Sequence, residues 1–397
     1  MKKLFSSLPV RLLLGVIVGI VVGLVANDGL MNVVVTIKYI LNQLIIFCVP
    51  LIIIGFIAPS ITKLGQNASK LLGIALTIAY LSSIGAAFFS MAAGYVLIPN
   101  LSIVTEIEGL KALPDLVFRL DIPQIMPVMS ALVFSLLLGL AATWTKATAI
   151  TKVLDEFQKV VLQAVSRVII PVLPIFIAFT FCALSYEGTI TKQLPAFLQV
   201  IAIVMVGHFL WMALLYLLAG AYSKKNPMDV VKNYGPAYIT AVGTMSSAAT
   251  LAVALRCAKK SEPTLRDDMV DFGIPLFANI HLCGSVLTEV FFVMTISKIL
   301  YGQIPSVGSM VLFCLLLGIF AIGAPGVPGG TVMASLGIIV GVLGFDEMGT
   351  ALMLTIFALQ DSFGTACNVT GDGALTLMLT GYVEKHKIAK QSITVDL

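Results

Sequence analysis

Apolar residues occur along this chain in long uninterrupted stretches, where a soluble protein would alternate them with polar ones. A membrane-spanning helix needs about 20 largely apolar residues in succession. The stretches of about this length or longer in the first part of the chain are 8–26, 33–61, 70–99, 126–144, 157–184 and 193–222. The charged segment 101–124 separates two of them and is predicted to be a loop outside the membrane. The pattern predicts an all-α polytopic membrane protein.

Two later segments are apolar but interrupted by small and polar residues. The first, 228–258, is broken by Gly243–Ser247, and the second, 305–343, is broken by Gly323–Gly330. Basic residues stand on both sides of the first segment, whereas acidic residues follow the second. Two interrupted segments that enter from opposite sides are typical of inverted repeats with a binding site at the membrane midplane. The pattern predicts two re-entrant helical hairpins, with two ordinary kinked spans as the alternative.

Two more spans, 269–300 and 349–382, bring the predicted total to eight transmembrane helices besides the hairpins. The composition supports this class, because 59% of the 397 residues are apolar and only 11% are charged, against about 25% charged in soluble domains. The mean hydropathy of +1.04 excludes a water-soluble enzyme or a disordered chain. The net charge of +4 is too small and too scattered for a nucleic-acid site. The six cysteines lie far apart, which argues against zinc or a disulfide framework.

Loops rich in lysine and arginine alternate with acidic loops along the sequence. Cytoplasmic loops carry the excess of basic residues in membrane proteins, so both termini are predicted to be cytoplasmic. The Lys2–Lys3 pair precedes the first apolar stretch without a small-residue cleavage site after it, and we interpret that stretch as a membrane helix. The sequence thus predicts a multi-pass protein of the cell (inner) membrane.

The last span carries polar and ionisable residues at helical spacing. Asp361, Thr365, Asn368 and Asp372 follow one another at steps of four, three and four residues, which places them on one helical face. Ionisable residues inside a membrane are costly and mark functional sites. The stripe predicts a ligand or ion site, and its carboxylates suit an ammonium group, a cation or a proton.

The seventh span contains a second group of polar residues. Its break at Asn279–Ser285 includes His281, and Glu289 follows one turn later. The sequence Thr370–Gly373 also resembles the Gly-Asp of intramembrane aspartyl proteases, but that chemistry needs a second aspartate on a facing helix. No other span supplies an aspartate at membrane depth. An intramembrane hydrolase is therefore only a distant alternative.

These motifs together resemble the dicarboxylate/amino acid:cation symporter family, the glutamate-transporter homologues. The matching motifs are Asn368–Asp372 with Asp361 and Thr365 before it, the serine-rich hairpin tip Thr244–Thr250, the second tip Gly323–Gly330, and Asn279–Ser285 in place of the family's Asn-Met-Asp-Gly-Thr break. Gln360–Ser362 and Ser246–Ala249 are more similar to the sodium/serine-threonine symporter branch. The resemblance covers the whole chain in span order.

The resemblance implies an elevator-type fold and a homotrimer in the lipid bilayer. Residues 1–69 and 101–188 would form the trimerisation scaffold, with helices 1, 2, 4 and 5 and the external loop. Helix 3, at 70–100, would join 189–390 in a moving transport domain. That domain would contain helix 6, hairpin 1 (228–258), helix 7, hairpin 2 (305–343) and helix 8.

The resemblance also implies roles for individual residues. Asp361 would hold the amino group of an amino-acid substrate, and Asn368 its α-carboxylate. The full implied substrate set is Ser246, Ser247, Ser285, Val327, Gly330, Asp361, Gly364, Thr365 and Asn368. A sodium ion would bind at Asp372, with the backbone carbonyls of Phe277, His281 and Asn368. No organic cofactor is expected.

Three departures from the family pattern shape the functional prediction. Gly364 stands where carriers of acidic substrates have an arginine, which predicts a neutral substrate similar to serine, threonine or alanine. His281 and Cys283 replace an asparagine and an aspartate, which removes oxygen ligands from another of the family's sodium sites. Glu289 stands where some members carry a proton-binding glutamate. The prediction is a sodium symporter importing a neutral amino acid, with a proton-coupled or uncoupled carrier of amino acids or dicarboxylates as the alternative.

Overall fold

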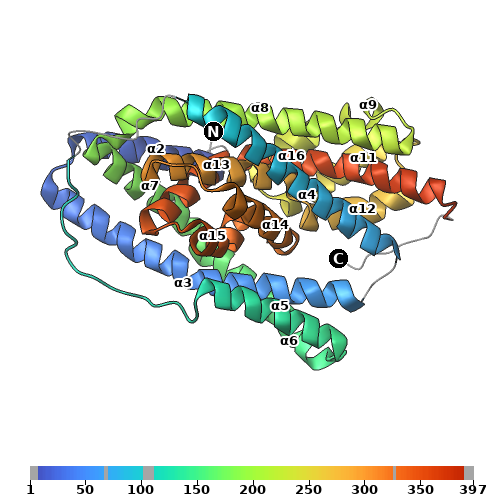
Figure 1. The fold of residues 1–397 in the computed structure, drawn as a ribbon, viewed down its shortest axis with the longest axis horizontal. Helices are drawn as coiled ribbons and strands as arrows, with labels where there is room; N and C mark the ends of the chain where they lie inside the picture. Colours follow the sequence, from blue (N-terminus) through green and yellow to red (C-terminus); the bar gives the residue numbers. More distant parts are fainter. Residues whose placement is uncertain (1–7, 67–69, 102–110, 325–327, 389–397) are drawn as a thin grey trace.

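The computed structural model describes residues 8–66, 70–101, 111–324 and 328–388. Lys2, Lys3 and Val327 lie outside the described residues. The described part of the chain contains helices, turns and loops and no strand, as the sequence predicts. In the view of Figure 1, α3, α5 and α6 follow one long edge, α8 follows the opposite edge, and the later helices lie between them.

The helices divide into two sets by their packing. Those of the first set pack mainly against one another, with α2 on α7 and α3 on α5, α6 and α7. Their bounds are α2 Leu8–Val25, α3 Asp28–Gln66, α5 Val128–Trp144, α6 Thr148–Ala164 and α7 Ile170–Glu187. A π-helical turn, Val165–Ile169, makes α6 and α7 continuous. The sequence prediction of 157–184 for this span therefore starts too late, because α6 is amphipathic and its polar positions hide its first turns.

The second set surrounds the last helix, which packs against α4, α8, α10, α12 and α13. The bounds of this set are α4 Lys70–Leu97, α8 Thr189–Ser223, α9 Met228–Val231, α10 Gly235–Thr244, α11 Ser247–Lys259, α12 Asp267–Ile280, α13 Cys283–Tyr301, α14 Val307–Gly323, α15 Gly330–Leu343 and α16 Glu347–Lys385. A short 3-10 turn, Ile98–Asn100, follows α4. Contacts between the two sets include those of α15 with α3 and α5, and of α7 with α8.

Helix breaks lie where the sequence predicts interruptions. Between α10 and α11, Met245 adopts a left-handed conformation, and the Ser246 side chain accepts a hydrogen bond from the Ala249 N–H. Between α12 and α13, His281 and Leu282 are extended or irregular. Gly329, with φ of +70°, precedes α15. Each break ends one helix and starts another inside the molecule, which leaves N–H and C=O groups available to bind.

Five helical segments of the described chain are long and apolar enough to cross a membrane. They are Asp28–Pro59, Leu71–Asn100, Thr148–Glu187, Phe197–Ser223 and Asp267–Tyr301. Shorter apolar helices occur at Val10–Val25, Val133–Trp144, Val307–Gly323 and Gly330–Leu343. The 39-residue α16 is not among these segments, and it contains the polar stripe. The protein is a polytopic helical membrane protein, and its most polar long helix lies inside it.

The predicted loop runs along the first set of helices. Its described part, from residue 111 to residue 127, follows α3 in Figure 1. The Asn32 side chain donates to the Asp115 carbonyl at 2.8 Å, and the Val117 N–H donates to the Thr36 hydroxyl at 2.9 Å. Lys111 pairs with Asp28 at 3.0 Å. The loop is thus tied to the start of α3 over more than two turns.

Candidate functional site

The polar stripe of α16 lies in the interior of the molecule. Asp361, Thr365, Asn368 and Asp372 are all at most 5% exposed. Since a buried polar side chain is costly unless it is hydrogen-bonded, the partners of each one define what the site can do. These partners come from the break between α12 and α13 and from the start of α15.

Asp361 faces the start of α15. Its Oδ2 accepts a hydrogen bond from the Gly329 N–H at 2.6 Å, and Thr365 follows one turn later on the same face of α16. Gly329 and the buried Gly330 form the N-terminal end of α15. A carboxylate at a helix N-terminus is stabilised by the free N–H groups and the helix dipole. The start of α15 therefore lies against Asp361.

Asn368 caps the N-terminus of α13. Its Oδ1 accepts from the N–H groups of Gly284 at 2.7 Å and Ser285 at 3.2 Å. Its Nδ2 donates to the Ser285 hydroxyl at 2.9 Å, which leaves one N–H of the amide for another acceptor. One side chain thus joins α16 to the break in the seventh span and still offers a donor.

We predict that Asn368→Ala lowers the thermal stability of the protein. The change leaves the buried N–H groups of Gly284 and Ser285 without an acceptor. Each unsatisfied group lowers the free energy of unfolding by about 1–3 kcal/mol. The matched variant Asn368→Asp keeps an acceptor oxygen for both N–H groups and should melt closer to the native protein. Thermal unfolding in detergent checks the pair, and equal melting temperatures for native and Asn368→Ala would contradict it.

Gly364 lies on the side of α16 that packs against α13. A Cβ atom at this position would come within 3.3 Å of the Cα and N atoms of Ser285. That contact is closer than ordinary van der Waals packing, so even a small side chain would press on α13. Position 364 therefore supplies no cation, and the backbone of α13 fills the adjacent space.

The tip of the first interrupted segment also packs on α16, through α10 and α11. Ser247 is 4% exposed, and Ser246 caps α11 through its side chain. The Thr244 and Thr250 hydroxyls lie 3.0 Å apart and join the two sides of this tip. The serine-rich motif thus stabilises a sharp reversal whose new helix starts at Ser247.

Asp372 is bonded to the imidazole of His281. The His281 Nδ1 lies 2.9 Å from Asp372 Oδ1, and the His281 Nε2 lies 2.9 Å from the Ser82 hydroxyl on α4. Asp372 Oδ2 has no hydrogen-bond partner among the described residues, although it is buried. A buried carboxylate oxygen without a donor fits a sodium ion, because hard cations prefer oxygen ligands. The Phe277 carbonyl already accepts from the His281 N–H at 2.9 Å, and its second lone pair remains.

Glu289 lies on the face of α13 that meets α15. It is fully buried and accepts a hydrogen bond from the Ser335 hydroxyl. Its Oε2 has no partner within the described part of the chain. Glu289 is therefore a second buried carboxyl group with one oxygen unpartnered among the described residues.

A family model places the whole of this arrangement in one class of proteins. The model of the sodium:dicarboxylate symporter family matches residues 8–382. The chain belongs to that family. It is a family of transporters, whose coupling ion is sodium, and this member is a multi-pass membrane protein.

Individual relatives of this chain include animal amino-acid transporters. It is 27% identical over 231 residues to excitatory amino acid transporter 2 of Mus musculus, a match that covers 56% of this chain and 39% of the relative. It is 26% identical over 263 residues to excitatory amino acid transporter 3 of Bos taurus, covering 65% and 48%. An excitatory amino acid transporter of Caenorhabditis elegans is 31% identical over 150 residues, covering 38% and 29%. The chain thus spans less than half the length of these relatives.

Three residues of the candidate site escape sequence reasoning. Ser82 lies on α4, 199 positions before its partner His281, in an ordinary apolar helix. Ser335, the partner of Glu289, lies in a similarly apolar stretch of α15. Gly329 belongs to a predicted tip, but its N–H has no signature in the sequence. Buried serines inside otherwise apolar spans are the signal that would select the first two.

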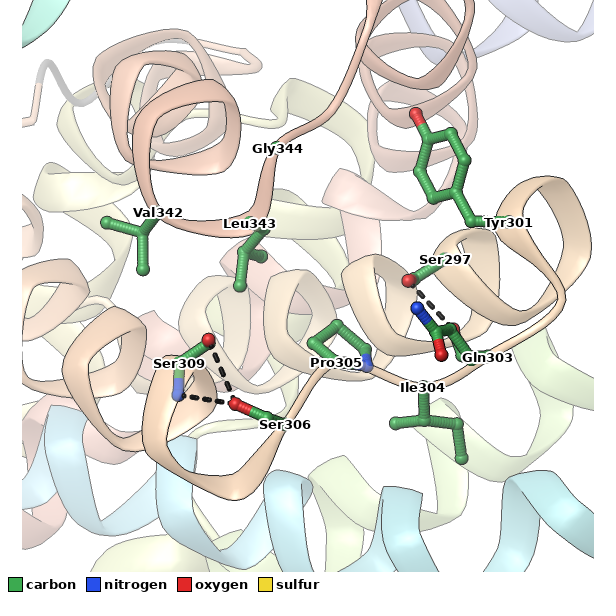
Figure 2. Close-up of a pocket in the computed structure, with 10 residues that line it drawn as sticks. All are labelled: Ser297, Tyr301, Gln303, Ile304, Pro305, Ser306, Ser309, Val342, Leu343 and Gly344. Carbon is green, nitrogen blue, oxygen red and sulfur yellow. Dashed lines mark hydrogen bonds between the residues drawn. The ribbon is translucent and has the colours of Figure 1, made fainter.

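A separate pocket lies at the base of the second interrupted segment. Figure 2 shows it between the end of α13, the segment leading into α14, and the end of α15. Ser297 donates to the Gln303 carbonyl at 2.9 Å, and Ser306 caps α14. No predicted site residue is among the described residues that line it. The pocket therefore lies beside the start of α14 and the end of α15, apart from the polar stripe.

Proposed function

We propose that this protein is a secondary active symporter that imports a small neutral amino acid, similar to serine, threonine or alanine, together with sodium. The observation that carries the proposal is the environment of Asp361. A buried carboxylate faces the N-terminus of α15, and one turn along α16 the packed Gly364 supplies no positive charge. The site offers one anion for an ammonium group and the remaining amide N–H of Asn368 for one carboxylate.

A second carboxylate on the substrate would be unfavourable in this site. Bidentate pairing with arginine is the usual way to bind such a group, and the backbone of Ser285 takes up the space beside Gly364. A hydroxyl or methyl side chain needs no cation, and the hydroxyls of Ser285 and Thr365 suit a hydroxylic substrate. This reasoning supports a neutral substrate over an acidic one, although relatives of this protein are named for excitatory amino acids.

Sodium would bind at the free Oδ2 of Asp372. The carbonyl oxygens of Phe277, His281 and Asn368 would supply further ligands, as the family motif implies. Bound there, the ion would neutralise a carboxylate that is otherwise costly inside the membrane. Its binding would favour the closed arrangement around the break between α12 and α13.

The two sets of helices support an elevator mechanism. The first set, with α2, α3, α5, α6 and α7, would form the scaffold of a homotrimer, and the second set would carry the site across the membrane. Both termini would face the cytoplasm of a cell whose inner membrane holds the protein. The contacts of α15 with α3 and α5 would then be those that change during transport.

Uptake into liposomes tests the proposal. We predict that an inward sodium gradient drives accumulation of labelled serine above equilibrium, and that excess unlabelled alanine or threonine inhibits it. Aspartate and glutamate should inhibit more weakly, by at least about tenfold in concentration, which is about 1.4 kcal/mol in binding. Stronger competition by aspartate than by serine would contradict the neutral-substrate assignment.

The same assay separates the alternatives. Accumulation that ignores sodium but follows a pH gradient, and loses its pH dependence in Glu289→Gln, would favour proton coupling through the buried pair with Ser335. Equilibration without accumulation would indicate an uncoupled carrier. Absence of transport together with cleavage of a membrane peptide would indicate the hydrolase.

A further inference from the structure

The imidazole of His281 bridges two helices that are far apart in the sequence. It lies between the Ser82 hydroxyl on α4 and the Asp372 carboxylate on α16, with both contacts at 2.9 Å. The ring is fully buried, and Asp372 is 1% exposed. Each ring nitrogen makes one of these contacts, Nδ1 with the carboxylate and Nε2 with the hydroxyl. Three elements therefore meet at one side chain.

The space around the ring is closely fitted to it. A Cβ atom at Gly371 would lie 2.8 Å from the His281 Cε1 and 3.3 Å from the Cys283 Sγ. Gly371 is therefore required for the ring to reach Asp372. Next to Ser82, the Ser83 hydroxyl is also buried and has no partner among the described residues. Without the ring, the Ser82 hydroxyl and Asp372 Oδ1 would lie on either side of the space that it leaves.

We propose that the imidazole of His281 is a built-in substitute for a bound cation, holding α4, the α12–α13 break and α16 together where oxygen atoms would otherwise need an ion between them. The inference rests on the proposed sodium coupling. It adds that the position between Ser82 and Asp372 is already filled by the imidazole. Sodium is left with the Oδ2 side of Asp372. One carboxylate thus serves a permanent side-chain partner on one oxygen and an exchangeable ion on the other.

The order Ser82, His281, Asp372 is also that of a nucleophilic triad. Ser82, however, lies in the middle of α4 and is only 6% exposed. Its hydroxyl is turned towards the ring inside the helix bundle. A substrate carbonyl would have to displace the packed helices to reach it, so the bonds position α4 and do not activate a nucleophile.

The test removes the ring and measures sodium binding without any substrate. The variant is His281→Asn combined with Cys283→Asp, which replaces a ring and a thiol with oxygen ligands. Melting temperature in detergent is recorded against sodium concentration, with choline as the replacement cation. Fluorescence of Trp211 gives a second readout in a Trp144→Phe background, because the indole lies against Gly85 and Phe89, about one to two turns after Ser82.

The native protein should keep its α4–α16 connection in sodium-free buffer and show a sodium response with a Hill coefficient of about 1. The double variant should melt lower without sodium and regain stability with it, with a Hill coefficient of about 2, since the coefficient is limited by the number of coupled sites. Transport of serine does not enter these measurements. A failure of the proposed substrate therefore leaves them unaffected, and a native protein that ignores sodium would count against the proposed coupling alone.

Two further variants keep the inference falsifiable if the double variant does not fold. Gly371→Ala displaces the ring without removing a polar group, and it should also acquire a larger stabilisation by sodium. His208→Asn is the matched control, because His208 is another buried bridging histidine, bonded to the Gly284 carbonyl and the Thr288 hydroxyl. It should lose stability without gaining a sodium response. The proposal would be overturned if the double variant and Gly371→Ala responded to sodium no more strongly than the native protein and His208→Asn.

Discussion

Replacing Asp361 with asparagine is expected to abolish substrate binding while the protein stays folded. The amide oxygen of asparagine still accepts from the Gly329 N–H, so the start of α15 keeps its hydrogen bond. The charge that would hold the ammonium group is lost, however. A buried hydrogen bond to a charged group contributes about 1.5–3 kcal/mol, which corresponds to roughly tenfold to more than a hundredfold in affinity. Equilibrium binding of labelled serine to purified protein measures the loss.

The control for this variant is Glu384→Gln on the same helix. Glu384 pairs with Lys225 at 2.7 Å near the end of α16 and is partly exposed. The chemical change is the same, but the position is remote from the polar stripe, so serine affinity should stay native. Near-native affinity in Asp361→Asn, or equal losses in both variants, would contradict the assignment of Asp361 as the ligand of the ammonium group.

Much of the fold is predictable because the bilayer imposes a simple requirement. Backbone groups in hydrocarbon must be satisfied within the segment, so long apolar stretches become helices. The breaks at Gly243–Ser247 and Gly323–Gly330 are equally visible in the sequence. Clusters of glycine, proline and serine disfavour a continuous apolar helix. The start of α6 is missed for a matching reason: Lys152, Asp155 and Glu156 make an amphipathic helix look like a loop.

For each contact in the site, the sequence predicts only one of the two partners. Asp361, Asn368 and Asp372 can be selected from the sequence, because ionisable and amide side chains are costly inside a membrane span unless they bind a partner. Their partners do not, since the Gly329 N–H is backbone and Ser82 is a small residue that spans tolerate. The sequence alone suggests that His281 removes an ion ligand. Only the fold shows that its ring takes up a position between two helices.

The packing of α2 on α7 depends on three glycines that no functional motif contains. Gly15, Gly19 and Gly23 follow one another at intervals of four residues, so they form one stripe along α2. A Cβ atom at Gly19 would lie 2.2 Å from the Ala178 carbonyl oxygen. The corresponding distances are 2.6 Å at Gly15 and 2.3 Å at Gly23, again to backbone oxygens of α7. Small residues let membrane helices approach closely, and their association depends on that contact.

Gly19→Leu is therefore expected to separate α2 from α7 and to destabilise the protein severely. Overpacking a core usually costs about 1–3 kcal/mol, and a clash with backbone along a rigid helix pair lies at the upper end, because no side chain can move aside. The matched control is Gly73→Leu on α4, where a Cβ atom would meet nothing within 4 Å among the described residues. Thermal unfolding and size-exclusion chromatography in detergent compare the two. A Gly19→Leu protein that melts like Gly73→Leu would show that α2 and α7 do not rely on this close approach.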